Sequence, residues 1–150
     1  AKLKMLHAFN MTIPGIPIIY YGDEIGMPGA NDPDNRRMMR FDNLTSFETD
    51  VKNTVTKLTN LRSTHMALLY GDFEVLEVSE TVYVYKRTYQ DDVVIVAFNK
   101  SPEIKTIIVK DSGSKNPDKA QFGNGISTND NTIAVFLAPY SFEVITMYNK

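Results

Sequence analysis

The sequence after Gly71 constrains the fold most, because it consists of short apolar segments separated by turns rich in Asn, Gly, Pro and Asp. Val, Ile, Thr, Tyr and Phe, which favour strands, dominate these segments, and several alternate with polar residues. Short strands at this spacing predict an antiparallel β-sandwich. The polar stretch 111–131 predicts a long excursion with one weak strand near 120–122. The expected strands cover residues 73–78, 82–86, 93–98, 105–109, 132–137 and 141–147.

The sequence before this point has helical periodicity instead. At the start of the chain, Leu3, Leu6 and Phe9, with Met5 beside them, predict the apolar face of a helix that ends near Asn10. The chain opens inside this helical pattern without a capping residue, so we expect a fragment of a longer protein.

A second helix is predicted over residues 47–66, with Ser46 as its N-cap and Gly71 as the stop after it. Its apolar residues recur at spacings of four, three and three, which is typical of a helix with one buried face. These residues are Val51, Val55, Leu58 and Leu61.

Between the two helices, residues 16–21 form a continuous apolar run that Gly22 ends. Such a run is typical of a strand buried on both faces, as in a parallel sheet or a barrel. Residues 26–43 follow, rich in Gly, Pro, Asp, Asn and Arg and without a period. They predict a long loop, and long ordered loops usually carry function.

Composition excludes several classes of function. The chain has 150 residues, a formal net charge of -2 and scattered Lys and Arg, which disfavours binding to nucleic acid or to an anionic membrane. It has no Cys, so disulfides, thiolate zinc sites and Cys nucleophiles are excluded. His7 and His65 lack a metal-ligand spacing and are expected on helix surfaces or partly packed. The longest apolar stretch, 13–21, is too short to cross a bilayer.

Asp23 and Glu24 are the first candidates for chemistry, because they follow the apolar run at the edge where barrel enzymes place their active sites. A glycosidase needs two carboxyls roughly 5 to 9 Å apart. Adjacent residues of a strand point to opposite faces, so these two do not form such a pair. A supporting role is favoured over direct catalysis.

The loop 31–37, of sequence NDPDNRR, is the second candidate. Its carboxylate, amide and guanidinium groups can form paired hydrogen bonds with sugar hydroxyls. Asp32 and Arg36 are the residues of interest. The alternative is an Asp–Arg pair within the loop that only shapes the turn, and spacing alone leaves both open.

The aromatic residues of the second half could offer flat faces for sugars, but several occupy positions typical of a sandwich core. Core packing is therefore favoured over sugar stacking. The set comprises Tyr83, Tyr85, Tyr89, Phe98, Phe136, Phe142 and Tyr148.

Residues 15–27 (GIPIIYYGDEIGM) closely resemble the last barrel strand of the α-amylase family, glycoside hydrolase family 13, whose pattern there is G-x-P-x-x-Y-Y-G-x-E. Residues 31–36 (NDPDNR) resemble the loop that follows that strand, and 39–42 (MRFD) its continuation. Residues 67–73 resemble the family's passage into its C-terminal β-domain, and Phe98-Asn99 a strand of that domain. The resemblance covers essentially the whole chain.

The resemblance implies an α+β fold: the last strand and helix of a (β/α)8 barrel over residues 1–71, then a C-terminal antiparallel β-sandwich over 72–150. It implies that Asp32 and Arg36 bind glucose on the non-reducing side of the cleavage point. It also implies that Glu24 is not catalytic, and that the three catalytic carboxylates lie upstream of this chain. The parent would hydrolyse α-1,4-linked glucans with retention.

We therefore expect a fragment that is inactive alone, with no cofactor or metal and with a mainly structural sandwich. The partner of the parent is an α-glucan or maltooligosaccharide. The run 16–21, without barrel neighbours, is expected to pair elsewhere, to fold onto the sandwich or to drive self-association. The alternatives are a non-catalytic starch-binding module and a purely structural domain. The cellular compartment is left open.

Overall fold

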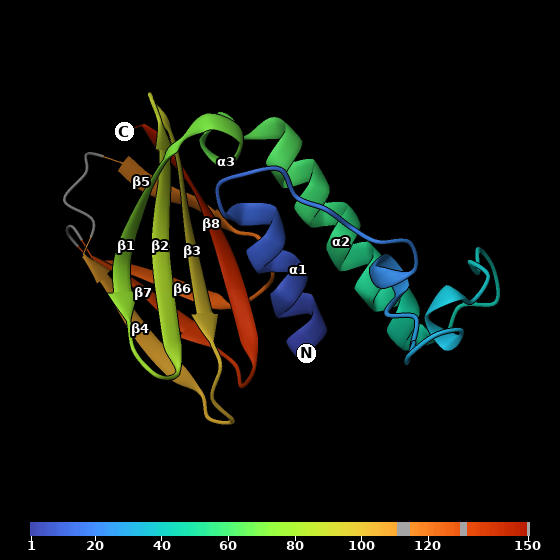
Figure 1. Cartoon of the computed structure of the whole chain (residues 1–150). Helices are drawn as coiled ribbons and strands as arrows, with labels where there is room; N and C mark the ends of the chain where they lie inside the picture. Colours follow the sequence, from blue (N-terminus) through green and yellow to red (C-terminus); the bar gives the residue numbers. More distant parts are fainter. Residues whose placement is uncertain (111–114, 130–131, 150) are drawn as a thin grey trace.

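We describe the protein from a computed structural model, which covers residues 1–110, 115–129 and 132–149. Two β-sheets pack face to face, and a layer of helices covers the outer face of the larger sheet (Figure 1). The helical elements are α1 (Lys2–Thr12), the 3-10 turns η1 (Asp23–Ile25) and η2 (Asp34–Arg36), α2 (Ser46–Thr64) and α3 (Met66–Tyr70).

The sandwich consists of a five-stranded sheet in the order β1-β2-β3-β8-β5 and a three-stranded sheet in the order β4-β7-β6. All the described pairings are antiparallel, as the sequence predicts. The strands are β1 (Asp72–Val78), β2 (Val82–Tyr89), β3 (Asp92–Asn99), β4 (Lys105–Lys110), β5 (Lys115–Ala120), β6 (Gly125–Asn129), β7 (Thr132–Leu137) and β8 (Ser141–Asn149).

The five-stranded sheet is buried on both faces, and this explains the unbroken apolar run in β3. One face packs on the smaller sheet, with Ile95 and Ile145 in the shared core. The other face packs on the helices, where Tyr85, Phe98 and Val144 meet the apolar side of α1 and α2. A strand covered on both sides needs no polar alternation.

The excursion predicted over residues 111–131 is wrong in part. The structure places two strands there, β5 and β6, each at the edge of a sheet. Edge strands have one free side and tolerate polar residues, so their sequences lack an apolar period. The weak strand expected near 120–122 corresponds only to the end of β5. Residues 111–114 and 130–131 of the predicted excursion lie outside the described residues.

Helix α2 buries the predicted stripe of Val51, Val55, Leu58 and Leu61. Its N-cap is Thr45 rather than Ser46. The Thr45 hydroxyl accepts a hydrogen bond from Glu48 N, and the Glu48 carboxylate accepts one from Thr45 N at 2.7 Å. This reciprocal pair satisfies two free amides of the first turn.

Helix α2 also ends earlier than predicted, at Thr64, because His65 has an extended backbone that separates it from α3. Gly71 does stop a helix, but that helix is α3. A Cβ atom on Gly71 would lie 2.4 Å from the Ala67 carbonyl oxygen and 2.8 Å from that of Thr88. Close packing of backbone on backbone, rather than a left-handed turn, therefore requires glycine here.

Helix α1 buries Met5 of the predicted apolar face but otherwise a different set of residues, and it ends at Thr12 rather than near Asn10. Met5, Ala8 and Met11 are buried, whereas Leu6 and Phe9 are exposed. His7 is also buried, and its Nε2 lies 3.0 Å from the carbonyl oxygen of Asp23. The helix lies between α2 and β8, and this position, which periodicity cannot show, selects the buried face.

The strand predicted over residues 16–21 is absent: the segment has no regular secondary structure and belongs to neither sheet. Ile19 packs against the core, whereas Ile16 and Ile18 are 91% and 78% exposed. A strand forms only where neighbouring strands share its backbone hydrogen bonds. The strands of both described sheets pair with one another and not with this segment. Ile19 thus packs against the cluster that the helices share with the larger sheet.

Two buried arginines meet at the exit of α1: Arg62 ties α2 to this exit, and Arg87 of β2 joins the exit to the sandwich. Arg62 of α2 donates to the carbonyl oxygens of Met11 (2.7 Å), Ile13 and Gly15. Arg87 of β2 is 1% exposed and donates to Thr12 (2.8 Å), Gly71 (2.9 Å) and Asp72 (3.1 Å). The carbonyls at the negative end of α1 thus satisfy two cations that lie out of water.

Burial governs the titration of this junction. Desolvation lowers the pKa of Arg62 and, together with the nearby charge of Arg62, that of Arg87. Burial also raises the pKa of Tyr85, whose hydroxyl is hydrogen-bonded to Thr12. Around neutral pH, Arg62 and Arg87 stay protonated and Tyr85 stays neutral. The junction is therefore a fixed connection rather than a pH-sensitive one.

Candidate functional site

The loop between the extended segment and α2 carries the candidate site. It lies beyond the N-terminal end of α2, at the edge of the helical layer that is remote from the sandwich (Figure 1). Two local features begin it. Gly22 has a φ of 91°, which favours glycine, and the turn η1 buries Ile25 against α2.

Asp32 and Arg36, the predicted sugar-binding residues, form an ion pair. The Nη2 of Arg36 lies 2.9 Å from the Oδ2 of Asp32. The 3-10 turn η2, in which Arg36 N donates to Pro33 O at 3.0 Å, brings the two side chains together. Both side chains stay open to solvent, at 72% for Arg36 and 60% for Asp32. The pair leaves further donor and acceptor positions free for a ligand.

A second pair of the same kind follows in the loop. Both the Nε and the Nη2 of Arg37 contact the Oδ1 of Asp34, at 2.7 and 2.5 Å. The loop then reaches α2 through Arg40, whose Nη2 lies 3.1 Å from the Oε2 of Glu48. Hydrogen bonds from Thr45, with a further contribution from Arg40, lower the pKa of Glu48. The loop is therefore tied to the start of the helix.

Two tyrosines precede the candidate loop, and one of them, Tyr21, feels the charge of Arg36. The ring centroids of Tyr20 and Tyr21 are 4.6 Å apart, and both rings are partly exposed. Desolvation and a hydrogen bond with Tyr20 raise the pKa of Tyr21, while the positive charge of Arg36 opposes the rise. Arg36 therefore lies within electrostatic reach of Tyr21, and the site combines aromatic rings with a carboxylate and a guanidinium.

Asp23 and Glu24 serve the turn itself, as the sequence favours. The Oε2 of Glu24 accepts a hydrogen bond from Gly22 N at 2.8 Å, and the Oδ2 of Asp23 accepts one from Tyr20 N at 3.3 Å. The two carboxylates therefore do not form the pair of acid and nucleophile that a retaining glycosidase needs.

Tyr85, Phe98 and Phe142 are buried in the core, which confirms the predicted packing role for these three rings. Tyr83 is half-buried, whereas Tyr89 and Phe136 are partly exposed at 38% and 43%. The side chain of Tyr148 lies outside the described ones. The large rings of the sandwich are therefore used mainly for packing.

Sequence reasoning missed the buried polar side chains. Arg87 follows Tyr83 and Tyr85 at a spacing of two, so strand periodicity could have placed it on the same face, toward the helices. Glu143 is fully buried and accepts hydrogen bonds from Phe122 N, Asn124 N and Val144 N. No local signal distinguishes it from a surface glutamate.

Over the ranges 1–110, 115–129 and 132–149, no group of three or more His, Asp and Glu residues is placed to hold a metal ion. Within the same ranges, no helix has the length and apolar character needed to cross a membrane.

Comparison with known proteins places the sandwich in a family. A family model described as the α-amylase C-terminal domain matches residues 71–138. A cyclomaltodextrin glucanotransferase of Geobacillus stearothermophilus is 43% identical over 102 residues, which is 67% of this chain and 14% of the relative. A cyclomaltodextrinase of Geobacillus thermopakistaniensis is 35% identical over 144 residues, which is 94% of this chain and 24% of the relative.

The likeness extends to solved structures. The crystal structure of an Anoxybacillus α-amylase matches with a TM-score of 0.87 at 29% identity, covering 99% of this chain and 32% of that one. This match includes the helical layer as well as the sandwich. The chain thus spans between about one seventh and one third of the proteins it resembles.

A β-sandwich with a helical layer fixed to its outer face is thus the class of structure here. Residues 71–138 are an α-amylase C-terminal domain, and the chain corresponds to the C-terminal part of α-amylase-family enzymes.

Proposed function

We propose that this chain is the C-terminal part of a retaining α-glucan hydrolase of the α-amylase type, acting on α-1,4-linked glucans. Residues 1–71 would be the end of the catalytic (β/α)8 barrel and 72–150 the sandwich domain. The names of the relatives support the substrate class, since they include enzymes of cyclic maltodextrins and an α-amylase.

One observation carries the proposal: the ion pair of Asp32 and Arg36 is formed in advance and remains exposed, with Arg36 in electrostatic reach of Tyr21. A carboxylate and a guanidinium fixed side by side can bind neighbouring hydroxyls of one sugar ring in a single orientation. We assign this pair to the glycone side of the cleavage point. The exposed row of Ile16 and Ile18 would face the other strands of the barrel.

We infer that the chain alone is inactive. Retaining hydrolysis needs an acid and a nucleophile on the two sides of the bond. The carboxylates around the loop are engaged instead: Asp32 with Arg36, Asp34 with Arg37, Glu48 with Arg40, and Glu24 with a backbone amide. The sandwich is assigned a mainly structural role, because three of its aromatic rings lie in the core and three more pack against it. The first three are Tyr85, Phe98 and Phe142, and the others are Tyr83, Phe122 and Tyr140.

The test is a titration of the chain with maltoheptaose, in which NMR and calorimetry measure the binding. Asp32→Asn should weaken binding about tenfold, because a charge-assisted hydrogen bond contributes about 1.5 kcal/mol. Asp34→Asn is the matched control, since it breaks a similar pair, with Arg37, at a position of the same loop to which the resemblance assigns no sugar contact, and it should leave affinity unchanged. Equal effects of the two variants would contradict the assignment of Asp32.

A second assay separates the hydrolase from the alternative of a starch-binding module. We expect no release of reducing sugar from maltoheptaose or soluble starch by the chain itself. Binding that survives Asp32→Asn and Arg36→Gln together, and is lost when Tyr89 and Phe136 are replaced by Ala, would favour the binding module. These two rings are the partly exposed ones of the sandwich set.

A further inference from the structure

The connection between β5 and β6 ends in Asn124-Gly125, the only Asn-Gly pair in the sequence. Here the chain passes from the five-stranded sheet to the three-stranded one. In such a pair the backbone nitrogen of glycine can approach the asparagine side chain closely, because glycine has no Cβ atom to hinder it. The pair is therefore a candidate site for a chemical modification of the protein.

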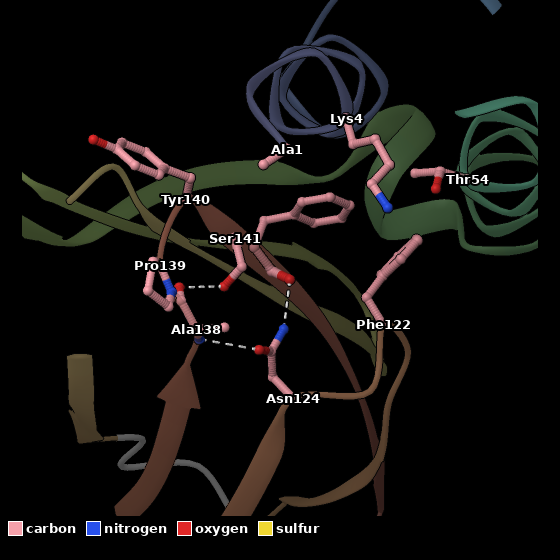
Figure 2. A pocket seen from close by; sticks show the side chains of 10 residues that line it. Ala1, Lys4, Thr54, Phe122, Asn124, Ala138, Pro139, Tyr140 and Ser141 are labelled. Atoms are coloured by element: carbon pink, nitrogen blue, oxygen red, sulfur yellow. Dashed lines mark hydrogen bonds between the residues drawn. The ribbon is translucent and has the colours of Figure 1, made fainter. Parts of the chain in front are cut away.

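The side-chain amide of Asn124 bridges this connection to β8 and to the segment that joins β7 to β8. Its Nδ2 donates a hydrogen bond to Phe142 O at 2.8 Å, and its Oδ1 accepts one from Ala138 N at 3.3 Å (Figure 2). The bridge thus uses a donor and an acceptor of the same side chain. A carboxylate could not take its place, because a carboxylate only accepts hydrogen bonds.

A buried carboxylate makes this requirement stricter. Glu143 of β8 is 0% exposed, and its Oε2 accepts a hydrogen bond from Asn124 N at 2.9 Å. The same oxygen lies 3.3 Å from the Nδ2 of Asn124. A second carboxylate in the place of the Asn124 amide would face the Glu143 carboxylate with no hydrogen between them. Two like charges held out of water repel strongly, so the bridge would break.

The fold does not require glycine at position 125. Gly123 has a φ of 86°, in the region that favours glycine, whereas Gly125 is not among the residues with positive φ. A Cβ atom on Gly125 would lie 3.4 Å from the Cδ2 of Phe136, which is an ordinary contact distance. Gly125 is also exposed, so water reaches the peptide bond. Alanine would fit here, and glycine therefore adds reactivity rather than a special conformation.

We propose that Asn124 is a deamidation site and that its conversion permanently breaks the bridge. The backbone nitrogen of Gly125 attacks the side-chain carbonyl carbon of Asn124 and forms a new C–N bond. The Gly125 nitrogen loses its proton, the bond between Cγ and Nδ2 breaks, and ammonia leaves with that proton. Water then opens the cyclic imide at either carbonyl, which yields aspartate or isoaspartate and one more negative charge. Water is the sole co-reactant.

The native hydrogen bonds control the rate of this reaction. They hold the side-chain amide of Asn124 on Phe142 and Ala138, so ring closure proceeds through a local opening of the connection. The rate should therefore follow the population of the open form. The carboxylate that results cannot restore the bridge, so a transient opening becomes a permanent change in the protein.

The first test is incubation of the whole chain at mildly alkaline pH, with mass spectrometry of the peptide that trypsin releases after Lys119. We expect a mass gain of about 1 Da at Asn124, with ammonia released in equal amount. Gly125→Ala should slow the gain about tenfold, because its Cβ atom hinders the attacking nitrogen. Asn116 is the internal control, since Pro117 follows it and has no N–H. Equal rates in the chain and in Gly125→Ala would overturn the site, as would a gain confined to other asparagines.

A second measurement tests the control by the fold. Urea at a concentration below the unfolding transition raises the population of the open form, so it should speed the mass gain at Asn124 several-fold. A rate that does not depend on urea would show that the native hydrogen bonds give no protection.

A third measurement tests the consequence for stability. Asn124→Asp, which mimics one product, should lower the midpoint of thermal unfolding by about 5 °C. Asn53→Asp is the control, because it adds the same charge at an exposed position of α2 and should leave the midpoint unchanged. If Asn124→Asp does not fold, the deamidated chain, separated from the unmodified chain by ion exchange, gives the same comparison. An unchanged midpoint would overturn the breaking of the bridge.

Discussion

The helical layer and the sandwich bury their apolar side chains in different ways. The sandwich closes a core of its own between two sheets, with Val135, Leu137 and Ile145 fully buried. Among the described residues no further apolar layer covers the helices, which bury Met5, Leu58 and Leu61 on the outer face of the larger sheet. The outer side of that layer keeps an apolar row that includes Ile16 and Ile18 exposed.

This difference teaches that the helical layer depends on the sandwich more than the reverse. Its core is shared, and its connection to the sandwich runs through buried charges rather than through apolar contacts alone. If this is right, damage at the junction should release the helices and leave the inter-sheet core standing. The four predictions below test the comparison, from the largest expected effect to the smallest.

Arg87→Met should lower the free energy of unfolding by about 4 kcal/mol, because the carbonyls of Thr12, Gly71 and Asp72 lose their donor while buried. Urea denaturation followed by circular dichroism and Tyr fluorescence measures the loss. Lys86→Met is the control, since Lys86 makes only a partly exposed pair with Glu74 and should cost less than about 1 kcal/mol. Equal costs for the two variants would contradict the role of the junction.

Leu58→Ala should cost about 3 kcal/mol, because the side chain is 1% exposed in the core that the helices share with the sheet. Ile95→Ala removes a similar volume from the core between the sheets. Hydrogen exchange separates them: Leu58→Ala should speed exchange in α1 and α2 while β3 stays protected. A uniform increase in exchange rate over both regions would show that they unfold as one cooperative unit. It would contradict the difference between the two regions.

Thr45→Ala should cost about 1 kcal/mol through loss of the helix cap. The pKa of Glu48 is lowered in the folded state, so its contribution is complete above the ordinary glutamate pKa of about 4.3 and is lost as pH falls through the folded value. Urea denaturation at pH 7 and pH 3 checks this. Glu48→Gln should remove part of the acid dependence, and an unchanged dependence would count against the capping carboxylate.

Asp32→Asn should change stability by less than about 0.5 kcal/mol, because the pair with Arg36 is exposed. Thermal unfolding of the variant and the parent chain measures this directly. A large loss would mean that the pair shapes the loop rather than serving a ligand, which is the alternative that spacing alone leaves open.

Self-association stays a prediction that the exposed row of Ile16 and Ile18 motivates. Light scattering on the purified chain reads its mass, and Ile18→Lys is the variant that should restore a monomer if a dimer forms. A monomer at high concentration would rule the association out.

Local sequence determined the elements whose signals are periodic. The strands β1, β2, β3, β4, β7 and β8 follow from short apolar segments between turns, and the buried face of α2 follows from residues spaced three and four apart. The loop motif of Asp32 and Arg36 stands in the sequence as well, but spacing alone left two interpretations open, so its assignment to a sugar comes from the family resemblance and stays a prediction.

Tertiary structure alone decided the rest, because it depends on which neighbours are present. The run at residues 16–21 has the composition of a buried strand, yet a strand forms only where other strands accept its hydrogen bonds. The buried face of α1 depends on where α2 and β8 lie. Arg87, Glu143 and Asn124 find their hydrogen-bond partners only where distant segments meet, since burial is a property of the assembled layers and not of any local stretch.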